Sequence, residues 1–580
     1  MWCKVNPKGK EFLILSLIFI KMAYKAREVR IGNLWLGGNQ PIRVQSMTST
    51  HTLDTLATVE QSIRIIEAGG ELVRITAPGL KEAANLRVIK NELKKRGYVV
   101  PLIADIHFNP HAAEIAARIV EKVRINPGNY TDKSNVKTAF PEKEYALEIE
   151  RIWERLKPLL KICKEYGTAI RIGVNHGSLS QRILNRYGDT PEGMVQSALE
   201  FTRICNEEGF QNLVLSMKSS NVQLMVQACR LLADRLALEG LNYPLHIGVT
   251  EAADGEDGRL KSVAGIGALL ARGIGDTIRV SLTESPELEL PVAKAIVNRF
   301  QYKHTPEDTR RYIRPDLEIH HEIERIPFFS DGKGRIGGKN PPAVVLKYKG
   351  TYFMAEENGS RTPLTETLLY ISDIQIQSAL AVFVDTLQQQ PDAVIVVEAG
   401  SGSVRQLINA LRDAGLNPPI LLKSPQEVNN VADALIENAL NPGNLLLDSL
   451  GDGIILDADI LGEEAAVRIG YGLLQITRRR ISRTEFIACP SCGRTLFNIQ
   501  EALREVKVRT AHLKGLKIAV MGCVVNGPGE MADADYGYVG AGNGKVNLYK
   551  GKEAVSRSIS EVDAVEALVQ LIKANGDWRD

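Results

Sequence analysis

The stretch "PLIADIHFNPHAAEIAARIVEKVRINPG", residues 101–128, decides the fold. It begins with an apolar run at 101–107, which predicts a buried strand. A helical pattern follows at 111–120, and a second apolar run at 122–128 predicts the next strand. Strand, helix and strand in such short succession form the repeating unit of a parallel α/β sheet.

The same alternation continues on both sides of this stretch. Six further strand-like runs lie at 41–47, 71–77, 169–175, 212–218, 245–252 and 277–283. Eight strands in βα alternation predict an α/β protein whose N-terminal domain, residues 23–304, is a (β/α)8 TIM barrel. An open doubly wound sheet is the alternative.

Two further regions follow the barrel. Residues 305–480 repeat the α/β pattern, with strand-like runs at 343–348, 392–400, 419–424, 444–449 and 452–458. They predict a central barrel-like insert domain, and its few strand-end cations and histidines favour a spacer or scaffold role. Residues 481–580 mix short strands with helices and predict a small α+β domain.

The chain ends and the overall composition limit the function classes. Residues 1–22 contain "FLILSLIFI", which is too short to span a bilayer, and we expect them to be an extension with no role in the fold. The net charge of +2 excludes a strongly basic nucleic-acid binder. Scattered cysteines such as Cys163 and Cys205 predict reduced thiols, so we expect a cytoplasmic protein with no membrane partner.

Polar side chains gather where the predicted barrel strands end. Side chains alternate along a strand, so Asp105 and His107 share a face, as do Arg171 and Asn175. The strand-end ring carries five cations: Arg74, Arg124, Arg171, Lys218 and Arg279. Only two carboxylates, Asp105 and Glu251, are recognisable there from the sequence. Because unpaired buried charge is costly, the ring predicts a small phosphorylated or diphosphorylated ligand, with His107 and Glu251 as acid/base candidates.

The cysteines of the third region follow the pattern C-x2-C-x30-C, formed by Cys489, Cys492 and Cys523. Three thiolates leave one position of a metal centre for another ligand. The candidates are His512, Glu530, Asp533 and Asp535. An iron–sulfur cluster, a structural zinc ion and unrelated thiols all stay open on spacing alone.

Several motifs together resemble the 4-hydroxy-3-methylbut-2-enyl diphosphate synthase family. They are "VQSMT", "ADIHF", "RINPGN", "RIGVNHGSL", "VTEA", "GIGDTIRVSL", "ACPSCGRT" and "MGCVVNGPGE". The resemblance covers residues 25–300 and 481–575, and the insert resembles the extra domain of the long form. It implies a [4Fe-4S] cluster held by Cys489, Cys492, Cys523 and Glu530, with Glu530 as an exchangeable ligand.

The resemblance also implies a substrate and its contacts. The family converts 2-C-methyl-D-erythritol 2,4-cyclodiphosphate, with two electrons, into an allylic diphosphate for non-mevalonate isoprenoid synthesis. The implied contacts are Arg74, Asp105, His107, Arg124, Asn126, Arg171, Asn175, Lys218, Glu251, Arg279, Ser281 and Asn526. Glu251 is the first choice of proton donor and His107 the second.

The expected partners follow from the same resemblance. Reduced ferredoxin or flavodoxin would supply the electrons, and the insert would let both halves of the site meet in one chain, so we expect a functional monomer. Two readings compete with this one. The first is a pterin-synthase-like phosphate-binding barrel with a zinc-stabilised accessory domain, and the second is a non-enzymatic binding protein with a structural metal.

Overall fold

The computed structural model describes most of the chain. The described residues are 24–130, 141–301, 328–330, 334–364, 367–390, 392–398, 400–495, 497–523, 527–531, 533–542 and 544–579. The predicted extension, residues 1–22, lies outside them. Within them, no helix is both long enough and apolar enough to cross a membrane.

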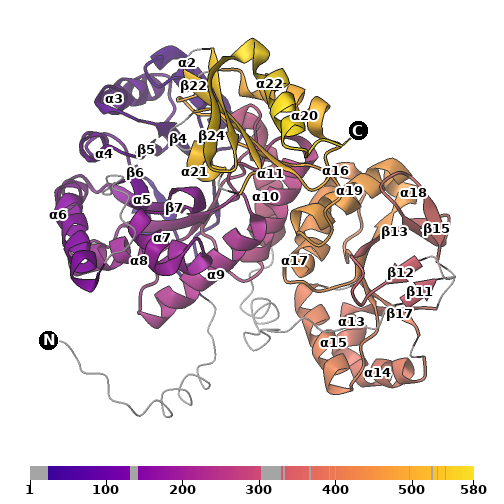
Figure 1. The fold of residues 1–580 in the computed structure, drawn as a ribbon. Helices are drawn as coiled ribbons and strands as arrows, with labels where there is room; N and C mark the ends of the chain where they lie inside the picture. The colour runs from indigo at the N-terminus through magenta and orange to yellow at the C-terminus, as the bar shows by residue number, and fades with distance from the viewer. Residues whose placement is uncertain are drawn as a thin grey trace.

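The first eight predicted strands form a parallel barrel (Figure 1). Its strands are β3 (Arg43–Met47), β4 (Leu72–Thr76), β5 (Leu102–Asp105), β6 (Lys122–Ile125), β7 (Ala169–Asn175), β8 (Leu213–Lys218), β9 (His246–Ile247) and β10 (Thr277–Ile278). They pair in the order β8-β7-β6-β5-β4-β3-β10-β9, and a bridge between Leu215 and Leu245 joins the two ends. The barrel prediction is confirmed, although β9 and β10 are much shorter than the apolar runs predicted.

Helices surround the barrel and are packed against it by their apolar faces. They are α2 (Thr55–Glu67), α3 (Leu80–Lys95), α4 (Pro110–Ala117), α5 (Pro127–Tyr130), α6 (Glu142–Tyr166), α7 (Gln181–Tyr187), α8 (Pro191–Glu207), α9 (Val222–Leu238), α10 (Gly255–Leu270) and α11 (Glu289–Gln301). Local sequence sets their starts: Asn109 caps α4 by accepting from His111 N at 3.1 Å, and Pro110 fits the first turn, where no amide donor is needed. Short 3-10 turns η1 (His176–Ser178) and η2 (Pro286–Leu288) follow β7 and β10.

A hairpin closes the N-terminal end of the barrel. Strands β1 (Val29–Ile31) and β2 (Leu34–Leu36) are antiparallel. They bury an apolar cluster with the first inward side chains of the barrel strands, among them Leu72, Ile103 and Val214. Only the carboxyl ends of the strands are therefore left to form a binding site, as in other barrels of this kind.

The central domain is a singly wound α/β sheet. Its strands are β13 (Ala343–Tyr348), β14 (Thr351–Ala355), β15 (Arg361–Pro363), β16 (Leu368–Ser372), β17 (Val394–Glu398), β18 (Ile420–Lys423) and β19 (Gly453–Asp457), and a two-stranded sheet pairs β11 (Phe328–Ser330) with β12 (Gly334–Ile336). Its helices are α13 (Asp373–Ser378), α14 (Leu380–Gln388), α15 (Ser401–Asp413), α16 (Val431–Leu440), α17 (Pro442–Leu447), α18 (Ala458–Leu461) and α19 (Glu463–Ile476). The order β15-β14-β13-β19-β18-β17-β16 is barrel-like in its parallel part but leaves the sheet open among the described strands.

One predicted strand of the central domain is wrong. Residues 444–449 fall largely within helix α17, not in the sheet. Asn441 and Pro442 begin a new helix there, and the run of leucines at 445–447 is buried on all sides. An apolar run without periodicity does not distinguish a buried strand from a short buried helix.

The C-terminal domain is a five-stranded mixed sheet with two helices on one face and a short third helix on the other. The sheet order is β20 (Glu485–Ala488), β21 (Lys517–Met521), β22 (Tyr536–Gly542), β23 (Lys545–Lys550) and β24 (Glu553–Ser560). Its helices are α20 (Ile499–Thr510), α21 (Gly527–Glu530) and α22 (Glu561–Ala574). The first three strands are parallel, so their carboxyl ends lie at one edge.

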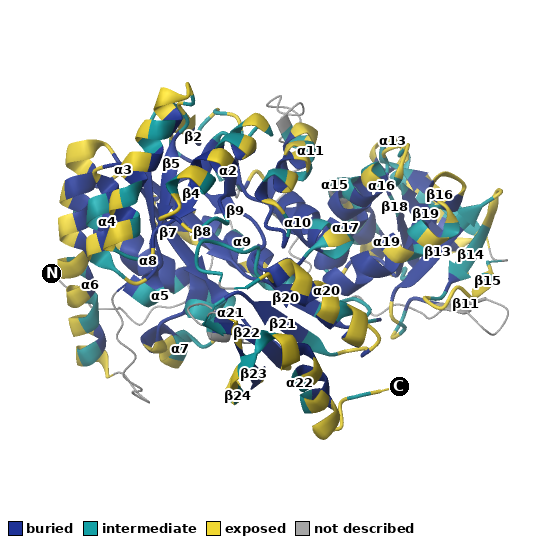
Figure 2. Ribbon diagram, turned by 90° about the horizontal axis from the view of Figure 1, so that it is seen from above, coloured by how far each residue is buried: buried dark blue, intermediate teal, exposed yellow. Residues whose placement is uncertain are grey.

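Helix α10 of the barrel joins all three domains and is almost wholly buried (Figure 2). The central helices α16, α17 and α19 pack on it, and Gly267 allows the close approach because a Cβ there would lie 2.3 Å from Leu440 Cδ2. On the same helix, Lys261 Nζ donates to the Phe486 carbonyl at 2.9 Å. Two glycines of "GIGALLARGIGD", Gly265 and Gly267, thus serve helix packing.

Candidate active site

One cavity lies between the barrel mouth and the cysteine-bearing loops of the C-terminal domain, within a single chain. Strand ends of the barrel form one wall, and the loops after β20 and β21 form the other. The predicted residues that line it are Arg74, Asp105, His107, Arg124, Arg171, Asn175, Lys218, Glu251, Arg279, Cys489, Cys492 and Cys523. Two groups predicted from separate parts of the sequence therefore face one space.

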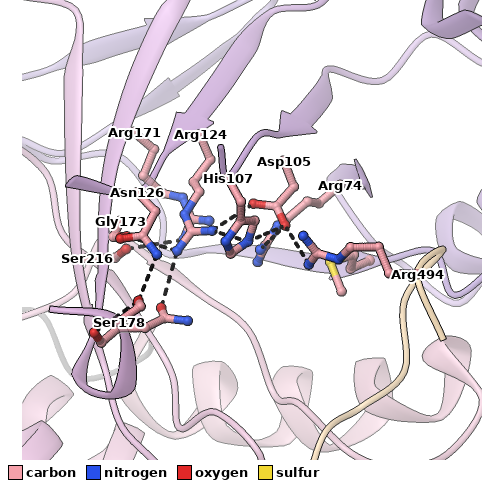
Figure 3. Close-up of polar contacts among 12 residues, drawn as sticks. Arg74, Asp105, His107, Arg124, Asn126, Arg171, Gly173, Ser178, Ser216 and Arg494 are labelled. Carbon is pink, nitrogen blue, oxygen red and sulfur yellow. Dashed lines mark hydrogen bonds and ion pairs between the residues drawn. The ribbon is translucent and has the colours of Figure 1, made fainter. Parts of the chain in front are cut away.

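Asp105, at the end of β5, is the centre of the polar network at the barrel mouth (Figure 3). Its fully buried carboxylate lies 2.7 Å from Arg74 Nη2, 3.1 Å from Arg124 Nη1 and 3.3 Å from His107 Nε2. Burial alone would raise the pKa of Asp105, but the two arginines hold it well below its ordinary value. The charged carboxylate thereby orients both guanidinium groups at the cavity wall.

The remaining ring cations are buried on neighbouring strands. Arg171 donates to Ser216 Oγ at 3.2 Å, and Arg279 Nη2 forms an ion pair of 3.1 Å with Glu289. Glu289, at the start of α11, is a third carboxylate that the sequence did not reveal. Burial and the neighbouring arginines lower the pKa of Lys218 well below its ordinary value.

The two proton-donor candidates differ in their surroundings. Burial, then Arg124 and Arg494, lower the pKa of His107 to about 3, so the imidazole is neutral at neutral pH. Glu251 lies in a left-handed backbone conformation with φ of 48°, which non-glycine residues rarely adopt. Its carbonyl accepts from Ala488 N at 3.3 Å and so joins the barrel to the C-terminal sheet.

The three cysteines follow the carboxyl ends of adjacent parallel strands, Cys489 after β20 and Cys523 after β21. Gly522 N donates to Cys489 Sγ at 3.2 Å, an N–H···S contact of the kind that surrounds metal-bound thiolates. Burial raises the pKa of the Cys492 thiol, but Arg494 beside it outweighs burial and lowers it. Three thiols outside any disulfide at one edge, one of them favoured as thiolate, fit an iron–sulfur group chemically.

The candidates for the fourth ligand lie in different places. The His512 ring packs edge-on against Trp578, with ring centroids 5.1 Å apart. Asp535 accepts from Lys517 N, at the amino end of β21, about 15 Å along the strand from the cysteine edge, and Asp533 is two residues away from it. Glu530 ends the short helix α21, whose first residue Gly527 lines the cavity. The Glu530 side chain lies outside the described part of the structure, and within that part no three His, Cys, Asp or Glu side chains are grouped as a metal site.

Three other predicted contacts do not line the cavity as described. Asn126 is buried beside it and donates from Nδ2 to Ser178 Oγ at 2.8 Å, which fixes η1. Ser281 is buried after β10. Asn526 lies outside the described residues. The cavity also includes Arg494 and Thr250, which were not predicted from the sequence.

The two walls meet in tight backbone contact. A Cβ placed on Gly529 would lie 1.8 Å from the Gly177 carbonyl oxygen, so helix α21 and turn η1 approach as closely as they do only because residue 529 lacks a side chain. The η1 residue His176 forms a 2.7 Å ion pair with Asp189 through Nε2. The approach of Gly529 to Gly177 brings the C-terminal domain against the barrel mouth, and the His176–Asp189 contact lies within the barrel.

A barrel with a cationic mouth, covered by a small domain that presents three cysteines, is typical of an enzyme that acts on an anionic small molecule. Comparison with known proteins gives the family. Residues 26–294 match the GcpE TIM-barrel domain, and residues 485–574 match the GcpE protein C-terminal domain. The chain belongs to the 4-hydroxy-3-methylbut-2-en-1-yl diphosphate synthase family.

Individual relatives support this assignment along almost the whole chain. The 4-hydroxy-3-methylbut-2-en-1-yl diphosphate synthase (flavodoxin) of Parabacteroides distasonis is 47% identical over 96% of this chain and 98% of its own length. The protein of the same name from Akkermansia muciniphila is 43% identical over 96% of this chain and 97% of its own. Among solved structures, the dihydropteroate synthase of Yersinia pestis aligns with a TM-score of 0.33 and 12% identity, over 48% of this chain and 100% of its own, and this likeness carries no functional argument.

Proposed function

We propose that the chain converts 2-C-methyl-D-erythritol 2,4-cyclodiphosphate to (E)-4-hydroxy-3-methylbut-2-enyl diphosphate by reductive ring opening and loss of the C3 hydroxyl. The observation that carries the proposal is the single cavity lined by both the ring cations and the three cysteines. The first group suits a diphosphate and the second suits an electron-transferring metal group. Relatives at up to 47% identity carry the name of this activity.

The barrel residues bind and orient the substrate in this proposal. Arg74 and Arg124 are held in place by Asp105, and Arg279 is held by Glu289. Preorganised guanidinium groups match phosphate oxygens without further ordering. The buried ring excludes water, which strengthens each of these contacts.

The proton for the departing hydroxyl comes from Glu251. Glu251 lines the cavity, and its main-chain carbonyl accepts a hydrogen bond from Ala488 on the cysteine-bearing strand. His107 is neutral and shares a 2.6 Å contact with Arg124 Nη1, which suits it to orienting the arginine rather than to supplying a proton.

The cofactor is a [4Fe-4S] cluster on Cys489, Cys492 and Cys523, with Glu530 as the fourth ligand. Bound there, it supplies two electrons in single steps. The peptide amide of Gly522 and the Arg494 guanidinium, both next to cysteine sulfurs, stabilise negative charge at that edge. Flavodoxin, which the relatives' names carry, or ferredoxin delivers the electrons.

A monomer is sufficient for this activity in our proposal. Both walls of the cavity come from one chain, and the central domain lies beside them without entering it. Light scattering of the active protein should give a single-chain mass, and turnover that required a dimer would contradict this part.

The test is anaerobic reconstitution of the full chain with iron and sulfide, followed by turnover with dithionite and a viologen. We expect a brown protein that forms the allylic diphosphate, and a Cys492→Ala variant that has neither property. A colourless, zinc-containing protein without turnover would instead favour the pterin-synthase-like reading. The variant Cys163→Ala, whose thiol is buried among barrel helices away from the cavity, is the matched control and should keep both colour and activity.

A further inference from the structure

Arg494 has no role in the site predicted from sequence, yet it lies within it. It follows Cys492 by two residues, on the loop after β20 of the C-terminal domain. Its side chain is 10% exposed and lines the common cavity. Figure 3 shows it beside Asp105, on the opposite side of that carboxylate from Arg124. A cation from one domain thus lies among the cations of another.

The contacts of Arg494 leave most of its donors unused. Nη2 lies 3.9 Å from Asp105 Oδ2, and the guanidinium lies beside the Cys492 thiol, whose pKa it lowers. Nε and Nη1 are buried and have no hydrogen-bond partner among the described residues. A buried guanidinium with two unpaired nitrogens, which carry three N–H groups, costs several kcal/mol unless an anion completes it.

Asp105 does not account for this arginine. Its two oxygens already contact Arg74 and Arg124 at 2.7 and 3.1 Å, shorter than the 3.9 Å to Arg494. Around the cavity, the five ring cations and Arg494 face the carboxylates of Asp105, Glu251 and Glu289 and the thiol of Cys492 among the described residues. The surplus of positive charge includes Arg494, and it calls for an anion with several oxygens.

We propose that Arg494 is a sixth diphosphate-binding cation, which the C-terminal domain contributes across its interface with the barrel. This inference rests on the proposed function, because it takes the ligand to be the diphosphate of that substrate. Nε and Nη1 point in different directions, so each would donate to a separate oxygen of the diphosphate while Nη2 keeps its place near Asp105. Because Arg494 also contacts Cys492, its charge acts on both the anion site at the barrel mouth and the cysteine edge of the C-terminal domain.

The experiment measures anion binding without the cluster. Cluster-free full-length protein, kept reduced, is titrated calorimetrically with inorganic pyrophosphate and with the cyclic diphosphate. We expect Arg494→Gln to weaken both by about 10- to 100-fold, since a charged hydrogen-bonding contact of ~1.5–3 kcal/mol is lost. Arg494→Lys, which keeps the charge but not the fork, should fall between the two.

Arg483→Gln is the matched control. Arg483 belongs to the same domain and forms a 2.5 Å ion pair with Asp257 of the barrel, so it also crosses the interface, but it does not line the cavity. Its loss should change pyrophosphate affinity by less than twofold. Unchanged affinity in Arg494→Gln, or an equal loss in both variants, would overturn the inference.

Two further readouts separate anion binding from a structural role. In the wild type, pyrophosphate should slow hydrogen exchange in residues 488–495, and Arg494→Gln should lack this effect while its melting temperature stays close to the wild type. In the loaded enzyme the variant should raise KM more than it lowers kcat. If the wild type bound pyrophosphate but not the cyclic diphosphate, the proposed function would fail; if it bound both and Arg494→Gln behaved identically, only the role of Arg494 would fail.

Discussion

The barrel and the central domain both alternate parallel strands with helices, but the carboxyl ends of their strands differ in the balance of cations and carboxylates. In the central domain, Lys347 pairs with Asp457 on the neighbouring strand at 3.2 Å, and Lys423 pairs with Glu398 at 2.7 Å. Each cation there has its own carboxylate, and all four side chains are partly exposed. At the barrel mouth, fewer carboxylates than cations are present and the cations are nearly fully buried.

This difference shows why two similar sheets have different roles. A balanced, solvated pair contributes little and needs no ligand, whereas buried surplus charge is stable only with an anion. Parallel βα alternation places side chains at the carboxyl edge of a sheet. The number of cations relative to carboxylates at that edge indicates whether it binds an anionic ligand. Four predictions test the comparison, beginning with the largest effect.

The sharpest test compares one strand-end cation from each domain. Arg124→Gln removes contacts to Asp105, His107 and Gly173 and leaves the buried carboxylate short of a partner. We expect kcat/KM for the cyclic diphosphate to fall by at least ~100-fold, equivalent to roughly 3 kcal/mol. Lys423→Gln in the central domain should stay within twofold, and similar losses in both variants would remove the distinction.

Closure should depend on a glycine in the cysteine domain. Gly529→Ala places a Cβ against the Gly177 carbonyl, so the two walls must move apart. We expect turnover to fall ~100-fold, because small displacements of reacting groups have effects of that size, while iron content is kept. Gly400→Ala in the central domain, where a Cβ meets nothing closer than 3.8 Å, is the control. Full activity of Gly529→Ala would show that closure is not needed.

The contact between the two α/β domains should affect stability more than activity. Asp448 of the central domain contacts Arg230 of the barrel at 2.5 Å and also Arg272 and Arg405. Burial would raise the pKa of Asp448, but these arginines lower it to about 2. Because this pKa is below the unfolded value, the stabilisation is present above about pH 4 and is lost as the pH falls toward 2.

Asp448→Asn should therefore reduce the free energy of unfolding by about 2 kcal/mol at neutral pH. Calorimetry should show the loss at pH 7 and a smaller difference from the wild type near pH 3. The control is Glu463→Gln, which removes an exposed pair with Arg361 in the same domain and should change stability by less than ~0.5 kcal/mol. Equal effects of the two variants would indicate that the domains are not joined through Asp448.

The smallest expected effect is a pH dependence of anion binding. Burial and the neighbouring arginines lower the pKa of Lys218, and a bound anion raises it again, so anion binding favours protonation of the Lys218 amine. The charged and titratable groups around it are Arg279, Arg171, Arg74, Glu251 and His246. Pyrophosphate affinity of the cluster-free protein should weaken as the pH rises, by at most about tenfold per pH unit for one proton. Lys218→Arg should show a flatter profile, and parallel profiles would assign the proton to another group.

Much of the barrel and its cationic mouth followed from the sequence because a strand has a period of two. Arg124 and Asp105 could be assigned to the barrel mouth from the alternation of side chains along their strands. This alternation does not predict side-chain direction in loops. Arg494 and Glu289 reach the site from outside the strands, and nothing in their local pattern gives their direction.

The remaining differences have similar causes. The 444–449 segment was misassigned because burial on all sides removes the periodicity that distinguishes a helix from a strand. His512 and Asp535 are separated from the cysteines by the parallel order of β20, β21 and β22, which residue spacing does not give. Glu530 and Asn526 still rest on the family resemblance.

Helix α10 has a practical consequence for shortening this chain. With the central domain excised, the groove around Gly267 that now receives Leu440 would face water, next to other apolar residues of the same helix. A truncated version would precipitate or self-associate through that stripe unless polar residues were introduced there. Miniaturisation therefore has to begin with the surface of α10, before any new linker is designed.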